Sequence, residues 1–280
     1  MAGFFEQLCK VVAETEHQRS GMAPSSPEIK QFFSDISKAP EAPKPVPVKP
    51  APPPIPRAPV TAKPVPPPIP PAPAKSFAPP VNNAAPVMGN FSTLDEIAAA
   101  VRRCSLCPLG ASRTNPVPGE GNPNARLMFI GEGPGFDEDM QGRPFVGKAG
   151  ALLDKMICAM QFTREEVYIA NIVKCRPPDN RVPTPEEAQC CINYLKRQIE
   201  LVRPEVIVLL GATSVKYLLN ITNGISKMRG RWLSYENIPV MATFHPAFLL
   251  RQESAKRDTW NDLQQVMARF GKFHPGARQQ

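Results

Sequence analysis

Residues 126–147 read RLMFIGEGPGFDEDMQGRPFVG, and this stretch decides how the rest of the chain is interpreted. The apolar run from Leu127 to Ile130 is typical of a buried strand, and it stops at Gly131, where a glycine-rich turn bearing Glu132 begins. In open α/β sheets, ligands bind beyond the carboxyl ends of the strands, where glycine lets the backbone approach them closely. The stretch therefore predicts a strand that ends in a site, although a turn without a ligand has the same pattern.

The prolines of the chain are concentrated in one segment. Of the 36 prolines in 280 residues, twenty lie within residues 40–86, and Phe77 is the single aromatic residue among them. Such a segment cannot bury enough apolar surface to fold. We predict a disordered, extended linker at 39–90, which separates a tail at 1–38 from a folded domain at 91–280 that is long enough for one α/β core.

The tail contains two short patterns of apolar residues at helical spacing, which predict short amphipathic helices. The first lies within residues 1–20 and includes Phe4, Phe5 and Leu8, and the second lies within residues 29–36. Helices of this kind can dock on a replication or repair protein, and the alternative is a frayed tail without a partner.

The charge and the cysteines of the chain indicate its partner and its compartment. The formal net charge of +8 suits DNA as a partner, although the linker alone carries half of this excess. The amino terminus lacks the uninterrupted apolar region of a signal peptide, and we expect no membrane association. We therefore expect a cytoplasmic protein, in a bacterial-type cytosol or nucleoid, whose seven cysteines are metal ligands or thiols. Cys9 and Cys158 are expected to be plain thiols.

Apolar periodicity in the domain predicts strands that alternate with helices. This alternation predicts a three-layer α/β/α sandwich with a central, mostly parallel sheet. The first helix is expected to begin at Ser92 as its N-cap, with Asp95 as the reciprocal capping partner. The predicted strands cover 127–131, 168–173 and 206–210 with an outer pair at 229–236 and 239–243, and the predicted helices cover 92–101, 147–160, 183–201, residues from 211, and 256–270.

Four cysteines of the domain have a spacing that suits a metal centre. Cys104 and Cys107 form a C-x2-C pair, while Cys175 follows a predicted strand and Cys191 lies on the next helix. Four thiolates suit either tetrahedral zinc or a 4Fe-4S cluster, and the wide second spacing, unlike that of a zinc ribbon, favours iron–sulfur over zinc. Adjacent helical residues point about 100° apart, so only one of Cys190 and Cys191 can face the centre.

Five motifs occur in one order along the domain. They are Cys104-x2-Cys107, Gly131-Glu-Gly-Pro-Gly135, Gly142-Arg-Pro-Phe-Val146, Asn171-Ile-Val-Lys-Cys175 and His245-Pro-Ala-Phe-Leu-Leu-Arg251. Together they resemble family 4 uracil-DNA glycosylases, the iron–sulfur branch of the uracil-DNA glycosylase superfamily. The resemblance implies a monomeric enzyme of that fold, which flips uracil out of single- or double-stranded DNA and hydrolyses the N-glycosidic bond, leaving an abasic site for base excision repair.

The resemblance assigns a role to each residue of the expected pocket. His245 would donate to uracil O2, where negative charge grows as the bond breaks. Phe145 would stack on the ring, and Asn171 would accept from N3–H and donate to O4, which turns cytosine away. Glu132 and the backbone of Gly133 lie where relatives position the attacking water.

The turn departs from the best-known branch of the superfamily, in which a catalytic aspartate and a tyrosine occupy the positions of Gly133 and Gly135. The general base is therefore open. Glu132 is our choice and Asp139 the second candidate, and a mechanism based mainly on electrostatic stabilisation is a third option. The means of excluding thymine is also unassigned.

The last motif matches the superfamily's minor-groove wedge. By this match Leu249 would intercalate, with Leu250 as its neighbour. Arg251, Arg229 and Arg231 are candidate phosphate contacts, and solvated surface charge is the alternative for all three.

The same resemblance makes Cys104, Cys107, Cys175 and Cys191 the ligands of a 4Fe-4S cluster, with Cys191 preferred to Cys190. The cluster is expected to be structural, because the reaction requires no electrons. A function of another class stays open at this point: a non-catalytic, metal-stapled DNA-binding module that the tail tethers to a repair or replication assembly.

Overall fold

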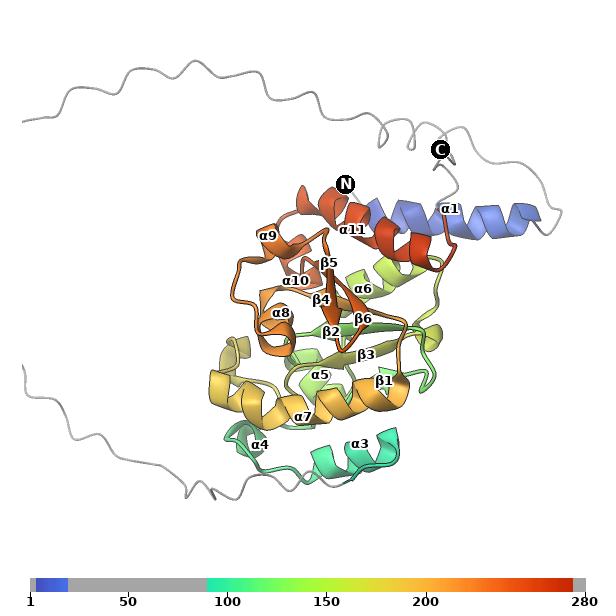
Figure 1. The fold of residues 1–280 in the computed structure, drawn as a ribbon. Helices are drawn as coiled ribbons and strands as arrows, with labels where there is room; N and C mark the ends of the chain where they lie inside the picture. Colours follow the sequence, from blue (N-terminus) through green and yellow to red (C-terminus); the bar gives the residue numbers. More distant parts are fainter. Residues whose placement is uncertain (1–3, 20–89, 274–280) are drawn as a thin grey trace, which may run out of the picture.

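A six-stranded sheet forms the centre of the molecule (Figure 1). The computed structural model describes residues 4–19 and 90–273, so the second tail pattern and nearly all of the proline-rich segment lie outside the described residues. The four central strands are parallel, while β1 and β5 run antiparallel to their neighbours at the two edges. The predicted mostly parallel sheet is confirmed. In spatial order the strands are β1 (Glu120–Gly121), β3 (Tyr168–Asn171), β2 (Leu127–Gly131), β4 (Val206–Leu210), β6 (Ile238–Thr243) and β5 (Trp232–Tyr235).

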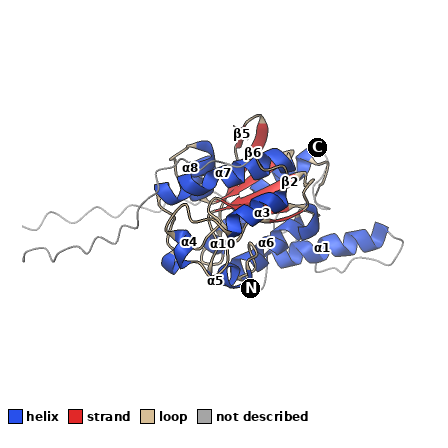
Figure 2. Ribbon diagram, turned by 90° about the horizontal axis from the view of Figure 1, so that it is seen from below, coloured by secondary structure: helices blue, strands red, loops and turns tan. Residues whose placement is uncertain are grey.

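Helices cover both faces of the sheet, as the predicted α/β/α sandwich requires (Figure 2). Because side chains alternate along a strand, Leu127 and Phe129 pack with α1, α6 and α11, whereas Met128 and Ile130 pack with α3, α7 and α8. The helices are α1 (Phe4–Arg19), α3 (Leu94–Arg102), α4 (Leu109–Ser112), α5 (Phe136–Gln141), α6 (Lys148–Ala159), α7 (Pro185–Val202), α8 (Ala212–Leu219), α9 (Ile225–Met228), α10 (Pro246–Leu249) and α11 (Ala255–Arg269), with 3-10 turns at Arg164–Glu166 and Pro178–Asn180. No helix within the described segments is long and apolar enough to cross a bilayer.

The N-cap of α3 differs from the sequence prediction. Thr93, not Ser92, is the cap, and its hydroxyl accepts a hydrogen bond from the backbone N–H of Glu96. The reciprocal bond comes from the Glu96 carboxylate, which accepts from the N–H of Ser92, so Asp95 does not take the predicted role. The helix starts one residue late because Thr93 supplies the same capping chemistry one position further along.

The first tail pattern forms helix α1, and its apolar face packs against the domain itself. Phe5 and Leu8 are buried in the core that α6 and α11 share with the sheet, and the ring of Phe5 meets that of Trp260 edge-on at 6.2 Å. This docking brings the Cα atoms of Cys9 and Cys158 to 5.5 Å, where they form a disulfide. The prediction that both are plain thiols is wrong, because the sequence does not show that α1 and α6 lie side by side.

Candidate functional site

The four parallel strands end at the same edge of the sheet, and the loops that follow them surround one cavity. Its volume is about 550 Å³. Lining residues come from the segments after β2, β3, β4 and β6, as expected at the carboxyl edge of a parallel sheet. The structure brings together these residues predicted for the site: Glu132, Gly133, Phe145, Asn171, His245 and Arg251.

Asn171, the last residue of β3, presents an unpaired acceptor. Its Oδ1 atom is buried and has no hydrogen-bond partner among the described residues. Gly131 stands opposite it on β2, and a Cβ atom there would lie 2.5 Å from this oxygen and 2.6 Å from Cζ of Phe145. Glycine at this position is therefore what lets the amide and the aromatic ring approach each other. A buried acceptor without a partner is costly, so this oxygen suits a ligand that brings an N–H donor.

Phe145 is held in place through its backbone. Its φ angle of 51° lies in the left-handed region, which bulky residues rarely adopt. Gly150 makes the room, because a Cβ there would lie 2.0 Å from the carbonyl oxygen of Phe145. Glu138 then accepts hydrogen bonds of 2.9 Å from the two backbone N–H groups that follow Phe145. The ring centroid lies 5.6 Å from that of His245.

Glu132 has a partner that the sequence did not reveal. Thr213, in the first turn of α8, donates from Oγ1 to Oε2 of Glu132 at 2.5 Å, and both residues line the cavity. Asp139, the second candidate base, is buried outside the cavity lining and accepts hydrogen bonds from the N–H groups of Thr114 and Asn115. The structure therefore does not support Asp139 as the base, because its carboxylate lies outside the cavity and accepts hydrogen bonds from the backbone of a loop.

His245 enters the cavity as a neutral donor. Burial, and to a lesser extent the charge of Arg251, lowers the pKa of His245 to about 4. Its Nδ1 atom accepts a hydrogen bond of 3.2 Å from the backbone N–H of Ala247, which leaves the ring proton on Nε2. A Cβ at Gly211, whose φ is +89°, would lie 3.1 Å from Cβ of His245, so the loop after β4 also fixes this histidine.

The structure contradicts the prediction that Leu249 is the intercalating wedge. Leu249 is 0% exposed and belongs to the core, so it cannot enter DNA without leaving the fold. Leu250 is 45% exposed, and Phe248, at 36%, is the other apolar side chain of this loop that faces solvent. Leu250 is therefore the better candidate wedge, and Arg251 lies beside it on the cavity wall.

Arg229 is a structural residue and not an open phosphate contact. Its guanidinium donates to both carboxylate oxygens of Asp262, at 3.0 and 2.7 Å, and its side chain is only 19% exposed. Arg231 is exposed and keeps its predicted role as a candidate. The sequence could not separate the two, because only the fold places an acid beside the first.

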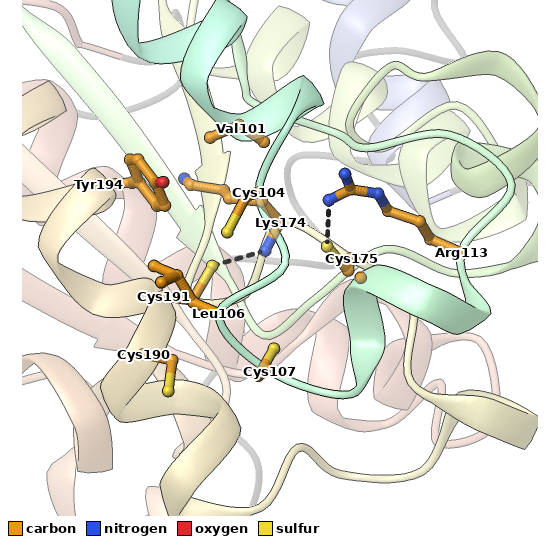
Figure 3. Close-up of a pocket in the computed structure, with 11 residues that line it drawn as sticks. Val101, Cys104, Leu106, Cys107, Arg113, Lys174, Cys175, Cys190, Cys191 and Tyr194 are labelled. Atoms are coloured by element: carbon orange, nitrogen blue, oxygen red, sulfur yellow. Dashed lines mark hydrogen bonds between the residues drawn. The ribbon is translucent and has the colours of Figure 1, made fainter. Parts of the chain in front are cut away.

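The predicted cysteine ligands line a second cavity, between α3, α4 and α7. Figure 3 shows the sulfur atoms of four cysteines turned toward a common space, whereas that of Cys190 points away from it. Cys191 is buried and Cys190 is half-buried, as expected if Cys191 faces the centre. The four sulfurs that face this space belong to Cys104, Cys107, Cys175 and Cys191.

Two hydrogen-bond donors point at sulfur atoms of this centre, while burial acts against a negative charge on them. Arg113 donates to Sγ of Cys175 at 3.0 Å, and the backbone N–H of Lys174 donates to Sγ of Cys191 at 3.2 Å. Without a metal, burial raises the pKa of the Cys191 thiol to about 12. In the part of the chain that the structure describes, no three His, Cys, Asp or Glu side chains are arranged to hold a single metal ion.

Lys174 is a functional candidate that sequence analysis missed. Its side chain is fully buried, and Nζ donates to the carbonyl oxygen of Asn171 at 2.9 Å and to Oε1 of Gln198 at 2.6 Å. Burial lowers the pKa of Lys174 to about 8, while Cys191 and Cys175 act in the opposite direction. Gln198 in turn donates to the hydroxyl of Tyr168.

Comparisons with known proteins show which sequences this chain resembles. Residues 118–264 match the family described as the uracil DNA glycosylase superfamily. The chain is 46% identical to a type-4 uracil-DNA glycosylase of Thermotoga maritima, over 62% of the chain and 88% of that protein. It is 41% identical to a type-4 uracil-DNA glycosylase of Archaeoglobus fulgidus, over 65% of the chain and 96% of that protein. A type-5 uracil-DNA glycosylase of Pyrobaculum aerophilum is 33% identical, over 47% of the chain and 66% of that protein.

Proposed function

The chain belongs to the uracil-DNA glycosylase superfamily and, within it, to the type-4 enzymes, and we propose that it excises uracil from DNA by hydrolysing the N-glycosidic bond. One observation carries the assignment of the pocket. The buried Oδ1 atom of Asn171 lacks a partner among the described residues, and it lies in the same cavity as the neutral imidazole of His245. Uracil supplies what both groups need, an N3–H donor for the amide and a carbonyl acceptor for the ring N–H.

Recognition would rest on the two ends of the Asn171 amide. Oδ1 accepts from N3–H of uracil while Nδ2 donates to O4. Cytosine presents an amino donor at the second position, so it would leave the amide N–H facing another donor. Phe145, which its backbone holds in the cavity, supplies the stacking surface.

Catalysis would rest on charge stabilisation and on an oriented water. As the glycosidic bond stretches, negative charge grows at O2 of uracil, where the Nε2–H group of His245 donates. The positive charge that grows on the sugar is stabilised by Glu132, whose Oε2 atom is held by Thr213. Water that enters the cavity beside Glu132 would give up its proton to this carboxylate as it attacks the sugar.

DNA must lose base stacking before uracil can reach the cavity. We propose that Leu250, exposed at the rim, fills the space that the flipped nucleotide leaves. Arg251 lies next to it on the cavity wall and would hold a neighbouring phosphate.

We propose that the four facing cysteines hold a 4Fe-4S cluster. Four thiolates suit either zinc or such a cluster, and the wide spacing between Cys175 and Cys191 is unlike that of a zinc ribbon. A cluster takes one thiolate at each of its irons, so its ligands can stand further apart. Its contribution would be to join α3, the segment after β3, and α7. Protein purified without air should hold iron and acid-labile sulfide with a broad visible absorbance band, and a colourless, zinc-loaded protein would overturn this part.

The test of the function uses oligonucleotides that contain a single uracil, hypoxanthine or thymine opposite guanine. Wild-type protein should convert the uracil site into an alkali-labile abasic site without added nucleotide or metal. His245→Ala should lower the rate by about 10²- to 10³-fold, the usual effect of losing a donor to a developing oxyanion. Uracil-containing DNA that stays intact with the wild-type protein would reject the function.

A further inference from the structure

Lys174 lies between the four-cysteine centre and the uracil pocket, and the activity described above does not use it directly. Its side chain is 1% exposed, which is rare for lysine, because a buried ammonium must be paired. The two acceptors it faces are the carbonyl oxygen of Asn171 and Oε1 of Gln198. Figure 3 shows Lys174 among the cysteines, with its backbone N–H bonded to the sulfur of Cys191.

The segment from Asn171 to Cys175 is fixed at both ends. At one end, the N–H groups of Ile172 and Val173 donate to the carbonyl oxygens of Gly131 and Glu132. At the other end, Lys174 donates from its backbone to Cys191, and its carbonyl oxygen accepts from the N–H of Val117 at 2.8 Å.

The Lys174 side chain then folds back within this segment. Its ammonium binds the carbonyl oxygen of Asn171, the residue whose amide faces the cavity. One residue thus contacts a cysteine ligand through its backbone and the uracil-recognising residue through its side chain.

The Asn171 amide is closely packed on the side that faces Gly131, so its position depends on the backbone that carries it. Its Oδ1 atom sits so close to Gly131 that even a methyl group there would lie 2.5 Å away. The backbone of Asn171 therefore sets where its amide meets the base.

We propose that Lys174 is a positioning residue, which couples the fold of the four-cysteine centre to the orientation of the Asn171 amide. The inference rests on the proposed function, because it assumes that this amide binds uracil. Cysteine coordination would fix Lys174 through Cys175 and Cys191, and Lys174 would fix Asn171. The centre then supports base recognition at a distance, without touching the substrate.

Lys174→Met tests the coupling, because methionine keeps an apolar stem but cannot donate to Asn171. Arg113→Met is the matched control. It also removes a cation beside a cysteine ligand, but Arg113 bonds Cys175 and the carbonyl oxygen of Arg102 and does not line the uracil cavity. Each variant is compared with wild type in its iron and sulfide content, its visible absorbance, its kcat and KM for uracil-containing DNA, and its inhibition by free uracil.

With the visible band retained, Lys174→Met should bind free uracil at least tenfold more weakly than wild type. Arg113→Met should bind uracil normally while losing iron faster to a chelator. The inference is overturned if Lys174→Met keeps both its cluster and wild-type uracil inhibition. It is also overturned if both variants lose uracil affinity in proportion to the iron they lose, which would indicate a general loss of structure.

If Lys174→Met does not fold, Lys174→Gln replaces it. Glutamine is uncharged and shorter, so it cannot reach both acceptors, and wild-type uracil inhibition in that variant would equally overturn the inference. Failure of the proposed function is distinguishable, because it would appear first as wild-type protein that releases no uracil.

Discussion

The hydroxyl of Thr213 donates to Oε2 of Glu132 at 2.5 Å and joins the first turn of α8 to the turn after β2. This bond restricts the carboxylate to one orientation in the cavity. Thr213→Val keeps the shape of the side chain and removes the donor, so kcat should fall about tenfold, since a hydrogen bond to a charged group is worth about 1.5 kcal/mol. KM should change little, because Glu132 is assigned to the reacting sugar and water.

Thr213→Ser is the matched control, because serine keeps the hydroxyl and should restore most of the rate. Glu132→Gln should be slower than Thr213→Val, by about 10²-fold or more if Glu132 is the general base. Single-turnover excision from single-stranded DNA measures all three variants. Equal rates for Glu132→Gln and wild type would contradict both roles of Glu132, as the general base and as the charge that stabilises the sugar.

Gly131→Ala tests the close packing of the pocket floor. The added methyl would lie 2.5 Å from Oδ1 of Asn171 and 2.6 Å from Cζ of Phe145, so both groups must move. Excision should fall by about 10²-fold, the scale expected when a binding group shifts by about 1 Å. Gly224→Ala is the control, since its Cβ would have no described atom within 4 Å, and it should be as active as wild type.

The protonation of His245 predicts a pH profile. Its pKa is lowered from 6.5 to about 4, so the ring is neutral above about pH 5 and gains a proton only as the pH falls through about 4. Excision should therefore not decline through loss of neutral His245 between about pH 8 and pH 5.5. Nitrogen NMR of the ring should show the Nε2-protonated tautomer throughout this range, and a titration near 6.5 would contradict the assignment.

Leu250 and Leu249 should behave in opposite ways when truncated. Leu250→Ala removes an exposed side chain, so stability should be unchanged while excision from duplex DNA falls more than excision from single strands, in which flipping is easier. Leu249→Ala opens a cavity in the core and should cost about 2–5 kcal/mol of unfolding free energy. Thermal unfolding and excision from both substrates separate the two effects.

The sequence predicted where the pocket lies because several of its residues stand at the ends of strands, while the family resemblance supplied their roles. Asn171 ends β3, Glu132 follows β2 directly and His245 lies two residues after β6. A parallel sheet brings such ends together whatever the details of packing. Thr213 follows the same rule beyond β4, but a threonine in an apolar helix gave no chemical signal by itself.

The remaining features depend on contacts that sequence patterns do not encode. Helix α10 has four residues, too few for periodicity to show that Leu249 points inward and Leu250 outward. Nothing in the sequence around Lys174 distinguishes it from a surface lysine, although it is fully buried. The Cys9–Cys158 disulfide could not be predicted, because the sequence does not show that α1 docks on α6.

The most direct measurement follows base release and DNA binding in the same sample. A fluorescent single-stranded oligonucleotide with one uracil is mixed with wild-type protein or with Asn171→Leu, a variant that fills the site of the unpaired amide oxygen with an apolar group. Free uracil is quantified by chromatography, and DNA binding by anisotropy. Wild type should release one uracil per oligonucleotide, whereas Asn171→Leu should bind the DNA but release uracil at least about 10²-fold more slowly, because the base-recognising contacts are lost. Wild-type protein that binds the DNA and leaves every uracil in place would contradict the proposed function.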